Sequence, residues 1–183
     1  MPLSSSRKRQ LRIAVYTLMA VAFLTLPCAF WPTTPSTLAE AIRKADEVVI
    51  YVGLPHQLFE KHDLEEELRT KQVIEFYGYP FYQEPIVLTS SVINRLSEVF
   101  GDQKTYLPWS GPKLCGGFHP DYVVEWRVGW GRYRALICFG CDELQLGRWI
   151  WSRYDLAKDG DKSLRQTLQG FRKQRRGERL QTE

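Results

Sequence analysis

The apolar positions along the chain form one long uninterrupted run near the amino terminus, followed by shorter periodic segments. Ile13 to Trp31 carry no charged side chain, and the run lies between a basic segment and a stretch rich in proline, threonine and serine, Pro32 to Ser36. A helix that crosses a membrane needs about 20 apolar residues. The pattern therefore predicts a cytoplasmic basic segment over 1–12, a signal anchor or transmembrane helix over 13–31 and a linker over 32–36.

The residues that leave the apolar run indicate whether the segment is retained. Signal peptide cleavage needs small residues at the first and third positions before the cut, and the exit Leu26-Pro-Cys-Ala-Phe-Trp31 lacks this arrangement. We therefore expect an uncleaved anchor, and a secreted domain if the segment is cleaved after all. Because basic residues beside a membrane helix stay cytoplasmic, Arg7 to Arg12 predict a membrane-anchored domain on the extracytoplasmic side.

The shorter segments predict a mixture of helices and strands over 37–171. Amphipathic spacing and capping residues predict helices from Thr37 to about Lys44, over Glu60–Lys71 and Thr89–Gly101, and a last one that Asp161 caps. β-Branched and alternating runs predict strands over Glu47–Val52, Val73–Tyr77, Tyr122–Val128, Arg132–Phe139 and Glu143–Trp151, with an irregular extended segment over Tyr79–Ile86. The order indicates a single α+β domain with an antiparallel β-meander and three to four helices.

The net charge of +4 changes its meaning once it is located along the chain. The two basic ends, Arg7 to Arg12 and Arg172 to Arg179, account for the excess, and residues 13–171 hold 16 basic against 19 acidic side chains. A nucleic-acid binder carries its basic residues on the folded surface, so we expect no nucleic-acid partner. The like charges and Gly177 predict that residues 172–183 form a disordered basic tail.

Three cysteines and one histidine are expected to meet at one end of the predicted hairpin. A turn over Gly129–Gly131 places Val128 opposite Arg132, and the same register places Cys138 opposite Tyr122 and Cys141 opposite His119. Cys115 lies a few residues further along the same end. This register also puts Cys138 on the face that carries Val124, Trp126 and Leu136.

Three kinds of chemistry fit this cluster of Cys115, His119, Cys138 and Cys141. Three sulfurs and an imidazole are the ligand set of a structural zinc site. An oxidising compartment favours a disulfide instead, between Cys138 and Cys141 or between Cys115 and one of them. Buried thiols that act as small apolar side chains are the third alternative. We expect no cofactor apart from the zinc alternative.

A second set of polar residues lies after the first predicted strand. His56, Glu60 and His62 surround the loop there, and with His119 or Asp121 they could form an acid/base pair. That interpretation requires His56 to lie within about 10 Å of His119 and Cys141. The sequence carries none of the common nucleotide, hydrolase or metalloprotease motifs, which weakens the case for an enzyme.

Two blocks of sequence together resemble a known group of proteins. They are Gly53-Leu-Pro-His-Gln57 with Glu60, and Cys115-Gly-Gly-Phe-His-Pro-Asp-Tyr122 with Ile137-Cys-Phe-Gly-Cys141. Both resemble segments of uncharacterised bacterial exported or lipoprotein-like proteins, across roughly residues 38–156. The group has no known activity, so the resemblance supplies no catalytic residues. It implies only that the two blocks belong to one site or one structural core.

These observations leave two hypotheses about function. The first is a non-catalytic, membrane-tethered extracytoplasmic module whose cysteine cluster is structural, as a disulfide or a zinc site. The second is a small thiol-redox or acid/base enzyme that uses His56, His119 and the cysteines. The sequence names no protein or small-molecule partner beyond the membrane itself.

Overall fold

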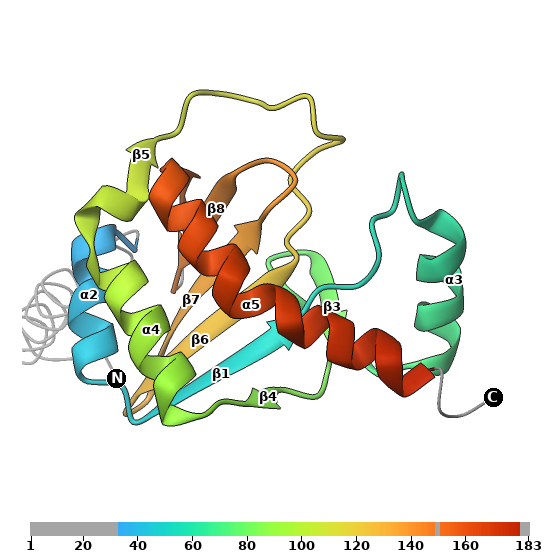
Figure 1. Cartoon of the computed structure of the whole chain (residues 1–183), viewed down its shortest axis with the longest axis horizontal. Coiled ribbons are helices and arrows are strands. Elements are labelled where there is room, and N and C mark those ends of the chain that lie inside the picture. Colours follow the sequence, from blue (N-terminus) through green and yellow to red (C-terminus); the bar gives the residue numbers. More distant parts are fainter. Residues whose placement is uncertain (1–32, 149–150, 180–183) are drawn as a thin grey trace, which may run out of the picture.

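The computed structural model describes residues 33–148 and 151–179 and shows an α+β fold built around one antiparallel sheet (Figure 1). Seven strands form this sheet in the order β4-β1-β6-β7-β8-β9-β5. Their bounds are β1 Glu47–Val52, β4 Ile86–Val87, β5 Tyr106–Pro108, β6 Tyr122–Val128, β7 Gly131–Cys138, β8 Glu143–Gly147 and β9 Trp151–Leu156. The helices are α2 Pro35–Arg43, α3 Lys61–Thr70, α4 Ser90–Gly101 and α5 Lys158–Arg179, with a short 3-10 turn η2 at Gln103–Thr105.

Strands β6 to β9 form the antiparallel meander that the sequence predicts, with one strand more than expected. Each strand of this group is hydrogen-bonded to the next along the chain. The stretch predicted as one strand, Glu143–Trp151, is divided between β8 and the start of β9, and β9 continues to Leu156. Gly147 pairs with Trp151 across this reversal.

The register of the β6–β7 hairpin differs from the predicted register by one residue. Val128 pairs with Gly131 rather than with Arg132, so Tyr122 lies opposite Ile137 instead of Cys138. The turn needs only Gly129 and Trp130 between the strands, and Gly129 has the positive φ of 52° that such tight reversals require. The prediction that Cys138 shares a face with Val124 and Trp126 is therefore wrong, because a shift of one residue moves a side chain to the other face of the sheet.

Helices α2, α4 and α5 cover one face of the sheet, as Figure 1 shows with α4 and α5 in front of the strands. Side chains of alternate strand residues meet them there, with Ile50, Val124 and Trp126 fully buried. Leu164 and Leu168 of α5 and Phe100 of α4 complete this core, and the ring centroids of Phe100 and Trp126 lie 4.9 Å apart. Apolar burial on this face accounts for the stability of the α+β arrangement.

The opposite face of the sheet is covered in part by a small hairpin. Strands β2, Val73–Phe76, and β3, Tyr79–Tyr82, form a separate two-stranded sheet. The prediction of an irregular extended segment over Tyr79–Ile86 is correct in that the backbone is extended at β3 and wrong in that it is irregular, because β3 pairs with β2 along its whole length. Phe76 and Phe81 pack against the sheet residues Val49, Tyr51, Val123 and Leu136 in a second core.

A buried carboxylate lies beside this second core. Glu125 is fully buried, and its oxygens accept from Arg134 Nε at 2.7 Å and from Arg127 Nε at 2.9 Å. The guanidinium of Arg134 also lies 4.6 Å from the centre of the Phe76 ring. Because Phe76 comes from the β2–β3 hairpin and Arg134 from the main sheet, this contact helps to join the two sheets.

Two helices start earlier than predicted, and a third lacks the capping hydrogen bond expected of its first residue. Thr34, not Thr37, is the N-cap of α2, and Thr37 supplies the reciprocal bond of the capping box. Thr89 occupies the N-cap position of α4 as predicted, but its side chain makes no capping hydrogen bond. Asp161 lies inside α5, where it forms an ion pair with Arg165 at 2.7 Å. The spacing of apolar residues thus located the helices better than the single polar residues located their ends.

Helix α5 also continues beyond the predicted end of the domain at residue 171. It runs to Arg179, and Arg172 forms ion pairs with Glu60 and Asp121. The prediction of a disordered tail beginning at Arg172 is therefore wrong for that residue. The predicted anchor over 13–31 lies outside the described residues, and within the described ranges no helix has the length and hydropathy of a membrane span.

Candidate functional site

The candidate site forms where the loop after β1 meets the loop that precedes β6. Gly53 joins the two loops, because its N–H donates to the Asp121 carbonyl oxygen at 2.7 Å. A Cβ atom at this position would lie 2.2 Å from the Pro120 carbonyl oxygen, which leaves room only for glycine. The close approach brings the two sequence blocks, 53–60 and 115–122, to the same end of the sheet.

Two histidine rings lie side by side in this site. The ring centroids of His56 and His119 lie 4.5 Å apart, with the rings tilted by 41°. His56 Nδ1 accepts from the backbone N–H of Leu58 at 3.0 Å, so the proton of the neutral ring lies on Nε2. This Nε2 atom is buried without a hydrogen-bond partner among the described residues. A ligand with an acceptor atom could satisfy it.

His119 is held in its neutral form by its surroundings. Burial lowers the pKa of His119 below its ordinary value, and the nearby His56 and the cation of Arg172 act in the same direction. Asp121 and the Pro55 carbonyl oppose this shift but do not overcome it. A neutral imidazole at neutral pH can accept a proton or a hydrogen bond.

Arg172 connects both loops to helix α5. Its Nη1 lies 2.5 Å from Asp121 Oδ1, and its Nη2 lies 3.1 Å from Glu60 Oε2. Each carboxylate also accepts from the backbone, Asp121 from Phe139 N–H and Glu60 from His56 N–H, both at 2.9 Å. The guanidinium therefore fixes the loop of His56 and the loop of His119 in relation to the helix.

The cysteines beside the histidines include one disulfide and one thiol. Cys115 and Cys141 are bonded, with their Cα atoms 5.6 Å apart, while Cys138 is a free buried thiol. The disulfide alternative of the sequence analysis is thus present, with Cys141 paired to Cys115. Two of the four predicted zinc ligands are consequently in a disulfide. Within residues 33–148 and 151–179, no group of three or more His, Cys, Asp or Glu side chains is arranged to hold a metal ion.

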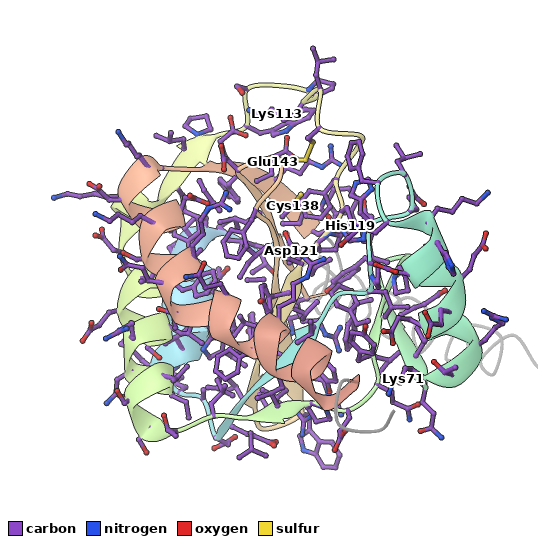
Figure 2. All side chains as sticks on the ribbon, turned by 45° about the vertical axis from the view of Figure 1, so that its right-hand side comes forward. Lys71, Lys113, His119, Asp121, Cys138 and Glu143 are labelled. Carbon is purple, nitrogen blue, oxygen red and sulfur yellow. A yellow bond between two sulfur atoms is a disulfide. The ribbon has the colours of Figure 1, made fainter. Side chains whose placement is uncertain are left out.

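The Cys138 sulfur lies against backbone donors. The N–H groups of His119, Gly140 and Cys141 face it and favour a thiolate, whereas burial opposes the charge and raises the pKa of Cys138. Desolvation is the larger effect, so the thiol is protonated at neutral pH. Figure 2 shows Cys138, His119 and Asp121 near one another at this end of the sheet.

These groups surround a pocket of about 310 Å³. Its walls include the two histidines, the acidic residues that Arg172 binds, and two of the three cysteines, namely His56, His119, Glu60, Asp121, Cys115 and Cys138. The structure therefore brings together six of the eight residues singled out from the sequence, and the disulfide bonds one more, Cys141, to Cys115. His62 is exposed on α3 and does not line the pocket.

Two residues of the pocket were missed in the sequence, Phe59 and Arg172. The ring centroids of Phe59 and His56 lie 4.5 Å apart, and Phe59 forms part of the pocket wall. Arg172 was assigned to the basic tail, although it continues the i,i+4 series of Leu164 and Leu168 along α5. That spacing was the available signal, and the surrounding positive charges concealed it.

Comparison with known proteins adds no further identification. No protein-family model, no curated protein and no solved structure matches this chain. The resemblance to exported bacterial proteins stays a prediction, and the geometry of the pocket carries the functional argument.

Proposed function

We propose that this chain is a membrane-tethered extracytoplasmic module whose Cys115–Cys141 disulfide is structural and holds together a pocket for a small ligand. The observation that carries the proposal is the disulfide itself. It joins the loop of His119 to the β7–β8 turn, between two residues 26 positions apart in the sequence. Disulfides of this kind persist in oxidising compartments outside the cytoplasm.

The pocket supports a binding role because its polar groups are arranged before any ligand arrives. Glu60 and Asp121 are occupied by Arg172 and by backbone N–H groups. His56 Nε2 is instead buried without a hydrogen-bond partner among the described residues. Small-molecule sites combine an enclosed, largely apolar pocket with a few such polar atoms. We expect a small neutral or anionic molecule with at least one acceptor atom.

The tether is tested by the mass of the mature protein. We expect the protein in the membrane fraction to retain residues 13–31, because the apolar run ends without a small-residue cleavage site. Intact mass spectrometry of that fraction measures this directly. A mature amino terminus between Ala29 and Ala41 would contradict the anchor.

The disulfide is tested in cells before lysis. Acid quenching followed by alkylation traps every free thiol, and a second reagent after reduction marks the bonded ones. We expect Cys115 and Cys141 to carry the second label in most of the molecules. Labelling of either residue by the first reagent in most of the molecules would refute the structural disulfide and the compartment that it implies.

A second candidate function, acid/base catalysis, is favoured by the 4.5 Å separation of the His56 and His119 rings. Acid/base catalysis by His56 and His119 requires their rings to lie close together, as they do here. An acid/base pair must share its titration, because a proton on one ring disfavours a proton on the other. The pKa of His119 is lowered partly by His56.

Nuclear magnetic resonance titration of the rings tests this coupling. We expect the midpoint of His119 to rise toward its ordinary value in a His56→Gln variant. The matched control is His62→Gln, since His62 is exposed on α3 outside the pocket. An unchanged His119 midpoint in His56→Gln would remove the acid/base pair as a candidate.

A further inference from the structure

Cys138 is the only described cysteine outside the disulfide, and it lies beside the bond rather than apart from it. Cys138 ends β7 and pairs with Glu143, the first residue of β8, so Cys138 and Cys141 share one tight turn. The Cys141 N–H faces the Cys138 sulfur. Cys115 and Cys138 also line the same pocket. One thiol and one disulfide therefore lie within a single turn and its neighbouring loop.

We propose that the site performs an internal thiol–disulfide exchange in which Cys138 takes over the bond to Cys141. The Cys138 sulfur attacks the Cys141 sulfur, the Cys138–Cys141 bond forms, and the Cys115–Cys141 bond breaks. The Cys138 thiol proton ends on the Cys115 sulfur. No atom or electron leaves the protein, so the step needs no external oxidant or reductant. The inference rests on the disulfide of the proposed function and adds a reaction to it.

Three backbone donors around Cys138 support its role as the attacking sulfur. The N–H groups of His119, Gly140 and Cys141 stabilise negative charge on this sulfur, although burial keeps it protonated at neutral pH. Histidines of the same pocket can accept the proton, and His119 is neutral there. The charged group that acts on this thiol is Asp121, which is itself paired with Arg172.

The exchange would release only the middle of the loop that carries Cys115. Trp109 Nε1 donates to Glu143 at 3.0 Å, and Lys113 Nζ lies 2.9 Å from Asp155, so the first half of the loop is attached to the sheet. At the other end, Asp121 is held by Arg172. Between these two attachments, the disulfide of Cys115 is a third, covalent attachment of the loop. Its release opens the pocket wall that Cys115 forms while His119 stays in place.

Trypsin makes the two bonding patterns easy to distinguish. It cleaves after Lys113, Arg127, Arg134 and Arg148, which places Cys115 in one peptide and both Cys138 and Cys141 in another. The original disulfide links these two peptides. The exchanged disulfide lies within the second peptide, and the first peptide then carries an alkylated Cys115.

The experiment uses the full chain with Cys28→Ser, purified in detergent without reductant, so that exchange is confined to the three cysteines of the domain. Samples at about pH 8 and about pH 9 are quenched with acid, alkylated with N-ethylmaleimide and digested. We expect the exchanged form to accumulate ~10-fold faster at the higher pH, because the thiolate of a thiol with a raised pKa increases tenfold per pH unit. The Cys138→Ser variant should give no exchanged form at either pH. Tryptophan fluorescence records whether the domain stays folded.

Two results separate the inference from the function on which it rests. If the starting protein lacks the Cys115–Cys141 linkage, the proposed function fails together with the exchange. If the linkage is present but does not move, or moves only after fluorescence reports unfolding, the exchange alone is refuted. A product that links the two peptides through Cys138 would also refute it, because Cys138 would then have attacked Cys115.

Discussion

Removing the Cys115–Cys141 bond should destabilise the domain by an amount that follows from its position in the chain. The perturbation is the double substitution Cys115→Ser with Cys141→Ser, which leaves no unpaired partner for Cys138. The bond closes a loop between residues 26 positions apart. In the chain-entropy description, closing a loop of that length lowers the entropy of the unfolded chain. This stabilises the folded state by about 3.5 kcal/mol at room temperature. We expect the free energy of unfolding to fall by that amount.

The assay is urea unfolding of the full chain in detergent, followed by tryptophan fluorescence. Both proteins should carry Cys28→Ser, and Cys138→Ser is the matched control because it removes a sulfur without opening the loop. A loss of about 3.5 kcal/mol corresponds to roughly 10 °C in melting temperature for a domain of this size. A loss below about 1 kcal/mol would refute the reasoning, since the loop would then be closed without the covalent bond.

Three further substitutions and conditions test other parts of the fold. Gly53→Ala should lower the free energy of unfolding by about 2 kcal/mol or more, because the new Cβ would overlap the Pro120 carbonyl oxygen. The control Gly101→Ala has open space around its Cβ and should be neutral or stabilising. Equal effects of the two substitutions would contradict the close approach at Gly53. Glu125→Ala should cost about 3 kcal/mol, because the mostly buried guanidinium of Arg134 loses its ion pair whereas Arg127 keeps Glu47, and a neutral result would show that Arg134 finds another partner. The pKa of His119 is lowered on folding, so the unfolded chain binds the proton first and stability should fall as the pH drops below about 6.5. Urea unfolding as a function of pH should show less of this loss in His119→Gln, and an identical profile would contradict the shift.

The sequence predicted the positions of most elements because their patterns are local. β1 was predicted with its observed bounds, and the amphipathic spacing located α4 and α5. The cysteine cluster was also predictable, since both strands of the β6–β7 hairpin end near each other in either register. The face of Cys138 was not, because both faces of this sheet are buried at that point and the apolar pattern does not select one.

What could not be predicted depends on contacts between distant parts of the chain. Strand β3 contains a proline and two tyrosines, and the β2–β3 hairpin becomes regular only because Phe76 and Phe81 pack on the sheet. Arg172 is one of several arginines in a basic stretch, and only the three-dimensional structure shows that it binds Glu60 and Asp121. Local propensity carries no information about either interaction, since tertiary packing decides both.

The pocket is held closed in two independent ways, and they respond to different conditions. Arg172 holds the loop of His56 and the loop of His119 through ion pairs. The disulfide holds the loop of Cys115 to the β7–β8 turn through a covalent bond. Reduction breaks the disulfide and leaves the ion pairs of Arg172. Because Asp121 lies only two residues from His119, its ion pair still holds the His119 loop. The His56–His119 pair should therefore persist in the reduced protein, whereas the wall formed by Cys115 should not. Reduction, like the internal exchange, would then alter access to the pocket without dispersing its polar groups.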